Sequence, residues 1–121
     1  MRASLLILFL VATPAIAQNW VGLLKNGPAE RFDEDDLRIF MDTARKALAE
    51  GKVDETLSWE NPKTRARGDI TVLRRFEWKK NPCKEVRIKN QAQGRKGNVT
   101  FGMCEVDGKW RVLSSSQAGK K

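Results

Sequence analysis

Apolar and polar residues alternate from Cys83 to Leu113, and this alternation predicts antiparallel strands. Asp107-Gly108 predicts a two-residue hairpin turn between two of them, because both residues tolerate the positive φ that a type I′ turn requires. That turn places Met103 opposite Val112 and Cys104 opposite Arg111. Since successive side chains point to opposite faces of a strand, the core face receives Val99, Phe101, Met103, Trp110 and Val112.

The two cysteines predict the register of the preceding strand. With Cys83 opposite Cys104, two further apolar pairs fall on the core face: Val86 with Phe101 and Ile88 with Val99. One register therefore satisfies both the apolar pattern and a cross-strand disulfide. The cysteines lack the Cys-x-x-Cys spacing of a redox-active pair. The polar segment from Asn90 to Gly97 is expected to be the connecting loop.

Helical spacing of apolar residues predicts one long helix from Glu34 to Glu50. Asp33 is the expected N-cap, and Phe32 and Leu37 occupy the positions of a hydrophobic staple. Gly51 is the expected residue at C′. No spaced ligand pattern accompanies the acidic first turn, so no metal is expected. The stripe that would pack on the sheet is Leu37, Phe40, Met41, Ala44, Ala47 and Leu48.

Two more strands are expected between this helix and Cys83. The first covers residues 53–59 and ends at Asn61-Pro62, and the second covers residues 69–78. The register of the second is open. A tight hairpin with Trp78 opposite Cys83 would put Trp78 on the disulfide face, whereas a loop from Lys79 to Cys83 would put Phe76 opposite Val86 and both aromatic residues in the core. The second alternative is preferred because it buries more aromatic area, and Pro82 also suits a loop.

A bulge near Leu73-Arg74 would mix these two alternatives. Taken together, the pattern predicts an α+β fold in which one long helix packs on a four- to five-stranded antiparallel, cystatin-like sheet with one cross-strand disulfide. The expected division is a signal peptide (1–17), an N-terminal arm (18–32), a single domain (33–114) and a flexible tail (115–121).

The first residues predict export. A basic residue, Arg2, precedes an apolar run over residues 5–12 that is too short to span a membrane, and Ala15-Ile16-Ala17 is a cleavage signal. The mature chain is expected to begin at Gln18 and to be periplasmic or secreted, where a disulfide persists. No cysteine follows the apolar run, so a lipoprotein is not expected.

The chain is basic, and this predicts an anionic partner. It has 23 basic and 15 acidic residues, and because only Arg2 lies in the signal peptide, the mature net charge is +7. Outside the cytosol the expected partners are an envelope protein or an anionic envelope component, such as lipopolysaccharide phosphates or lipid head groups, and not nucleic acid. The ordinary alternative is a charge that only keeps the protein in solution. The candidate binding residues are Lys63, Arg65, Arg67, Arg87, Lys89, Lys109 and Arg111.

The composition excludes several kinds of catalysis. The sequence has no histidine, which rules out Ser-His-Asp triads, Cys-His dyads and HExxH zinc sites. It also has no GxGxxG or P-loop motif, and its cysteines are expected to be paired. We therefore expect no enzyme activity and no cofactor.

Several motifs resemble the C-terminal domain of the bacterial 17 kDa surface antigen family. The resemblance covers roughly residues 37–113 and includes Trp59-Glu60-Asn61-Pro62, Gly68-Asp69-Ile70, Cys83, Gly102-Met103-Cys104 and Asp107-Gly108-Lys109-Trp110. It implies a helix followed by a curved antiparallel sheet, a cell-envelope location and no catalytic site. The chain departs from many family members, which carry a lipid-bearing cysteine and a Gly-rich region before this domain.

These expectations lead to a hypothesis of function: a small exported envelope protein that binds through a basic sheet face. The alternative is a cystatin-like inhibitor of a protease or other hydrolase, with the turns at Lys79–Pro82 and Asp107-Gly108 forming a wedge. A weaker possibility is a structural envelope component without a discrete ligand. The sequence does not indicate the oligomeric state.

Overall fold

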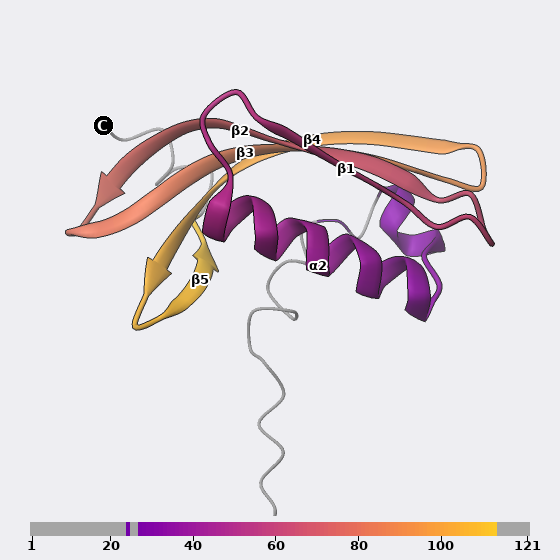
Figure 1. The fold of residues 1–121 in the computed structure, drawn as a ribbon, viewed down its shortest axis with the longest axis horizontal. Coiled ribbons are helices and arrows are strands. Elements are labelled where there is room, and N and C mark those ends of the chain that lie inside the picture. Colours follow the sequence, from indigo (N-terminus) through magenta and orange to yellow (C-terminus); the bar gives the residue numbers. More distant parts are fainter. Residues whose placement is uncertain (1–23, 25–26, 114–121) are drawn as a thin grey trace, which may run out of the picture.

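The computed structural model describes Leu24 and residues 27–113 and has the predicted α+β class (Figure 1). The five strands form one antiparallel sheet in the order β1-β2-β3-β4-β5, so each strand pairs with its neighbours in sequence. The predicted signal peptide, tail and most of the predicted arm lie outside the described residues. The elements are η1 (Pro28–Arg31), α2 (Glu34–Glu50), β1 (Thr56–Glu60), β2 (Arg67–Trp78), β3 (Asn81–Ala92), β4 (Arg95–Val106) and β5 (Lys109–Val112).

Helix α2 begins and ends at the predicted residues. The Asp36 backbone N–H donates to Asp33 Oδ1 (2.7 Å) and the Asp33 N–H donates to Asp36 Oδ2 (3.0 Å), which completes a capping box. Gly51 follows the last helical residue as predicted, but it is the C-cap residue and not C′, and its backbone is extended with a φ of −64°. A Cβ at Gly51 would lie 2.3 Å from Ala47 O and 2.9 Å from Val72 Cγ2, so the position needs glycine for space.

The main core lies between α2 and the concave side of the sheet (Figure 1). Phe40 and Leu48 of the helix share one buried cluster with Ile70, Val86 and Ile88 of the strands. Phe32, Phe40 and Trp59 pack their rings together, with centroids 5.2 to 5.9 Å apart. The apolar stripe read from the sequence is buried here except for Leu37, which is half-buried.

The predicted pairing of β3, β4 and β5 is confirmed. Cys83 lies opposite Cys104, Val86 opposite Phe101, and Met103 opposite Val112. The connection between β3 and β4 is shorter than expected, because β3 continues to Ala92 and only Gln93-Gly94 form the turn. The residues assigned to a loop over 90–97 are therefore mostly strand residues.

The preferred register of β2 against β3 is wrong. Phe76 lies opposite Cys83 and Trp78 opposite Asn81, with a two-residue turn at Lys79-Lys80. The register shifts between Val72 and Arg74, which is the bulge considered as a further alternative. One extra residue reverses which side chains face the core beyond that point, since alternation has a period of two.

Both aromatic residues consequently lie on the disulfide face. Phe76 and Trp78 pack on a second, small cluster of Cys83, Cys104 and Leu113. Pro82 is part of β3 and faces Glu77 of β2, but the pairing with β4 begins only at Cys83. Pro82 thus lies outside the part of β3 that has a strand on each side, which makes a residue without an N–H tolerable there.

The helices in the described part of the chain include none that is long and apolar enough to cross a membrane.

Candidate functional site

A groove of about 800 Å³ crosses β1 to β4 on the convex face of the sheet, opposite α2. Its floor is one cross-strand row of backbone whose side chains belong to the core face. Two rows of outward-facing side chains form its walls. The floor is Trp59, Gly68, Asn90 and Gly97; one wall is Ser58, Asp69, Lys89 and Asn98; the other is Glu60, Arg67, Gln91 and Lys96.

Close packing beneath the floor depends on Gly68. Trp59 Nε1 donates a hydrogen bond to Asn90 Oδ1 (3.3 Å), and both side chains are buried. A Cβ at Gly68 would lie 2.3 Å from Asn90 Oδ1 and 2.6 Å from Trp59 Nε1. The glycine therefore lets the indole and the amide meet directly behind the groove.

The groove is charged unevenly along its length. Its β1–β2 end carries two carboxylates, Glu60 and Asp69, and one guanidinium, that of Arg67, and Ser58 Oγ donates to Asp69 Oδ1 at 2.6 Å. Its β3–β4 end carries Lys89 and Lys96, whose ammonium groups make no hydrogen bond or ion pair to any described residue. Lys89 has the Asp69 carboxylate as its cross-strand neighbour, whereas Lys96 lies opposite the neutral Gln91. Two ammonium groups without an ion pair at one end of a polar groove favour an anionic ligand group there.

Arg87 occupies the next cross-strand row, beside the wall that contains Lys89. It lies opposite Thr71 on β2 and Thr100 on β4. Its Nε is buried and makes no hydrogen bond to the part of the chain that the structure describes. The Thr71 hydroxyl is bonded to the Thr56 hydroxyl at 2.8 Å, whereas the Thr100 hydroxyl makes no hydrogen bond to another described side chain.

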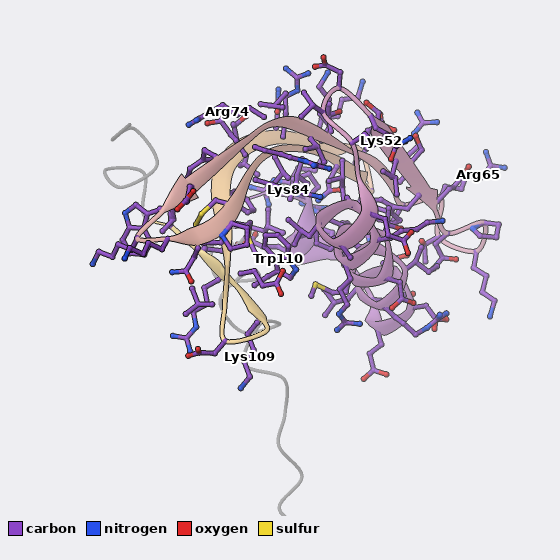
Figure 2. The ribbon with its side chains drawn as sticks, turned by 60° about the vertical axis from the view of Figure 1, so that its left-hand side comes forward. Lys52, Arg65, Arg74, Lys84, Lys109 and Trp110 are labelled. Carbon is purple, nitrogen blue, oxygen red and sulfur yellow. A yellow bond between two sulfur atoms is a disulfide. The ribbon has the colours of Figure 1, made fainter. Side chains whose placement is uncertain are left out.

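Further along the same face, Arg74 is occupied by other contacts. Its guanidinium pairs with Glu85 at 3.3 Å and lies 4.5 Å from the ring centroid of Phe76. Figure 2 shows Arg74 outside the sheet, whereas Lys84 and Trp110 lie on its inner side. Arg74 is thus part of the sheet's own packing, in contrast to Arg87.

The structure brings together only some of the predicted binding residues. Arg67 and Lys89 line the groove, and Arg87 lies in the adjoining row. Lys63 and Arg65 are exposed in the turn after β1 and do not line it. Lys109 and Arg111 are both on β5 and do not line the groove. In Figure 2 the tip of the β4–β5 hairpin, where Lys109 lies, is far from Arg65.

Lys96 lines the groove although it is not among the binding residues predicted from the sequence. It falls within the loop predicted between β3 and β4, and the face of a loop residue cannot be predicted from alternation. Had the turn been limited to Gln93-Gly94, alternation would have placed Lys96 opposite Gln91 on the convex face. A two-residue turn at Gln93-Gly94 is therefore the feature of the sequence from which the position of Lys96 could have been predicted.

A buried carboxylate holds the basic turn after β1 against the helix. Asp36 Oδ1 accepts hydrogen bonds from Asn61 Nδ2 (2.7 Å) and from the Thr64 hydroxyl. Burial raises the pKa of Asp36, but the hydrogen bonds from Thr64, the Asp33 backbone and Asn61 outweigh it and hold that pKa below its ordinary value. The network positions the turn that carries Lys63 and Arg65.

Lys84 is a second buried charge, and it is not among the residues predicted from the sequence. It extends from β3 to the C-terminus of α2, where its Nζ donates to Gly51 O (2.9 Å) and Ala47 O (3.4 Å) (Figure 2). The last turn of α2 has no basic residue of its own, so Lys84 supplies the cation that the helix dipole favours. Burial first, and then repulsion from Arg75, lower the pKa of Lys84.

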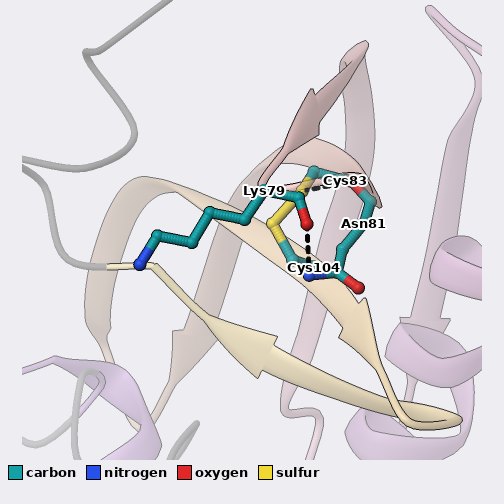
Figure 3. Close-up of a disulfide and its surroundings, with 4 residues drawn as sticks. All are labelled: Lys79, Asn81, Cys83 and Cys104. Carbon is teal, nitrogen blue, oxygen red and sulfur yellow. Dashed lines mark hydrogen bonds between the residues drawn. A yellow bond between two sulfur atoms is a disulfide. The ribbon is translucent and has the colours of Figure 1, made fainter.

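The predicted disulfide joins Cys83 and Cys104 across β3 and β4, with their Cα atoms 4.0 Å apart (Figure 3). The Asn81 side chain donates to Lys79 O at 3.3 Å beside it, at the Lys79-Lys80 turn. Both half-cystines are buried. The bridge therefore stabilises the end of the sheet that is remote from the groove.

Among the described residues, no group of three or more histidine, cysteine, aspartate or glutamate side chains could hold a metal ion. Comparisons of the chain with protein-family models, with curated proteins and with solved structures found no match.

Proposed function

We propose that this chain is a small exported protein of the bacterial cell envelope, of the surface-antigen type, that binds an anionic envelope component through the basic part of its convex sheet face. The observation that carries this proposal is the groove across β1 to β4, with the ammonium groups of Lys89 and Lys96 at one end and no ion pair from either to a described residue. Lipopolysaccharide phosphates and anionic lipid head groups are the candidate ligands in that compartment.

The chemistry of the groove supports binding more than catalysis. Its carboxylates, Glu60 and Asp69, are outward-facing, and neither has a neighbouring histidine or a thiol, since the sequence has no histidine and both cysteines form the bridge. A charged, open groove attracts a charged ligand and holds it with charge-assisted hydrogen bonds. The signal peptide and cleavage before Gln18 remain part of the proposal.

The inhibitor hypothesis has one observation in its favour. In a five-stranded meander the turns at Lys79-Lys80 and Asp107-Gly108 fall at the same end of the sheet, as a cystatin-like wedge requires. Nanomolar to micromolar inhibition of a panel of envelope hydrolases, lost on changing these two turns, would favour it. No inhibition, together with groove-dependent binding, would favour the first proposal.

The test of the proposed function is binding by protein recovered from the periplasm, after its mass has been checked against a start at Gln18. The probes are lipopolysaccharide and phosphatidylcholine vesicles with and without phosphatidylglycerol. Replacing Lys89 and Lys96 by Gln should weaken binding to the anionic probes by about thirtyfold, since each lysine near an anionic surface contributes about 1 kcal/mol.

The matched control removes the same charge elsewhere. Lys46 lies on the exposed face of α2 and Lys52 is exposed just beyond it. Replacing both by Gln should leave binding nearly unchanged. Equal losses in the two double variants would show that only the net charge matters, and the proposal would then be wrong.

A further inference from the structure

The row beside the groove has the composition of an oxyanion site. Arg87 and Lys89 are two residues apart on β3 and point to the same face, so their backbones are about 7 Å apart and their long side chains can reach a common point. Thr100 and Asn98 lie opposite them on β4. Thr71 and Asp69 lie opposite them on β2. The position between Arg87 and Lys89 thus has a hydroxyl and an amide on its β4 side, and a hydroxyl and the Asp69 carboxylate on its β2 side.

Arg87 is the residue in this row whose bonding is incomplete. Its Nε is the one buried side-chain nitrogen or oxygen without a hydrogen bond among the residues that the structure describes. Leaving a charged donor buried and unbonded is unfavourable, and such groups call for a specific explanation. Because Nε is buried in this conformation, the Arg87 side chain must turn toward the groove before an oxyanion can accept from Nε and an adjacent Nη, in the two-bond geometry that arginine favours with phosphate.

The walls of the groove next to this row suit hydroxyl groups. Ser58, Gln91 and Asn98 can each donate and accept, and Asp69 and Glu60 accept strongly. A sugar hydroxyl both donates and accepts, so it pairs with all of them. The walls contain no apolar side chain that would hold an acyl chain, and four strands span about 14 Å, long enough for more than one sugar ring.

From these observations we infer that the ligand of the groove is a phosphorylated saccharide, with its phosphate on Arg87 and Lys89 and its sugar hydroxyls along the groove toward Asp69. This inference rests on the proposed function, because it names the ligand class of the same groove. The sugar phosphate is the shared chemistry of a free ligand and of a glycolipid head group.

The test titrates the protein with glucose 1-phosphate, glucose, inorganic phosphate and glucuronate, and follows the Nε–H signal of Arg87 by NMR together with the affinity. Glucose 1-phosphate should bind at least about tenfold more tightly than each of the other three, because only it engages both parts of the site. It should also shift the Arg87 Nε–H signal. Lipopolysaccharide, with and without enzymatic removal of its phosphates, extends the comparison to a glycolipid.

Arg87→Lys keeps the charge but removes the Nε–H and the two-bond geometry, so it should weaken glucose 1-phosphate binding by about tenfold. Its thermal midpoint should equal or exceed that of the parent, since the unbonded Nε is removed. The matched control is Arg111→Lys on β5, which should bind normally.

Three results would overturn the inference: no binding of glucose 1-phosphate, binding of glucose, inorganic phosphate or glucuronate as tight as that of glucose 1-phosphate, or normal binding by Arg87→Lys. Its failure can be told apart from failure of the proposed function. If replacing Lys89 and Lys96 abolishes binding to anionic vesicles while Arg87→Lys binds every probe normally, only this inference is wrong. If neither change matters, the groove is not the binding site.

Discussion

Replacing Asp36 by Ala is the sharpest test of how the helix, the first strand and the basic turn are joined. The Asp36 side chain is 1% exposed and accepts three hydrogen bonds, from the Asp33 backbone N–H, from Asn61 Nδ2 and from the Thr64 hydroxyl. Alanine offers no acceptor to any of them. The change therefore removes half of the capping box and the link from α2 to the turn after β1.

The loss of the acceptor costs a different free energy for each of the three donors. Asn61 is 3% exposed, so its Nδ2 would be left buried without a partner, which costs about 1–3 kcal/mol. Thr64 is exposed and can turn to water, so its loss costs little. Loss of the reciprocal capping bond adds about 1 kcal/mol. The expected total is about 2–4 kcal/mol, which lowers the thermal midpoint of a domain this small by about 10 °C or more.

Urea unfolding at neutral pH measures this change, with Asp42→Ala as the control. Asp42 is on the same helix but exposed, with only a solvent-exposed ion pair to Arg45, so its removal should cost no more than about 0.5 kcal/mol. Equal destabilisation by the two substitutions would refute the reasoning, because it would show that the buried network contributes nothing beyond helix charge.

The pH dependence provides a second measurement. Because the pKa of Asp36 is lowered on folding, its contribution is fully present above the unfolded value of about 3.9 and is lost as the pH falls through the folded value. Asp36→Asn keeps one acceptor oxygen but cannot titrate. The stability difference between the parent and Asp36→Asn should therefore be largest at pH 7 and shrink below about pH 4. A constant difference over that range would contradict the assigned pKa shift.

Three further predictions follow from other parts of the fold. Replacing Cys83 and Cys104 by Ala should lower the free energy of unfolding by about 3 kcal/mol, measured in urea, since the bridge spans 21 residues. Because the pKa of Lys84 is lowered, the parent should gain stability relative to Lys84→Met as the pH rises toward the ordinary lysine value of 10.5, and a loss would contradict the shift. Gly68→Ala should cost about 2–4 kcal/mol and alter tryptophan fluorescence, because its Cβ would displace the Asn90 amide, whereas Gly27→Ala, with no atom closer than 3.5 Å, should not.

Local features of the sequence were sufficient to predict how β3, β4 and β5 pair. Asp107-Gly108 specifies its own turn, and the two cysteines allow only one register that also buries Val86 and Ile88. The capping residues of α2 act within four positions of one another, so they too could be read directly. These predictions succeeded because each depended on neighbouring residues or on a covalent link.

The register of β2 depended on a feature that carries no local signature. Lys79-Lys80 does not resemble a type I′ turn, yet both residues adopt positive φ, 48° and 64°. Because of the bulge at Leu73, Ile70 and Val72 lie in the core on one side of it, whereas Phe76, on the other side, pairs with Cys83 and faces away from the core. Burying Phe76 and Trp78 in the core and keeping the two-residue turn at Lys79-Lys80 require different registers of β2. Which register is more stable depends on the packing of the whole sheet and not on the residues near the turn.

The α+β class, the helix, the disulfide and the pairing of the last three strands can thus be predicted from the amino-acid sequence, because periodicity, caps and turn residues act over short distances. The groove and its charges become visible only in the folded chain. Ser58, Arg67, Lys89 and Lys96 come from four strands, and their meeting depends on the relative register of all four, which a bulge or a shortened turn changes by a whole face. The partners of Asp36 and Lys84 could not be predicted from the sequence for the same reason, since each side chain bonds to an element that is distant in sequence.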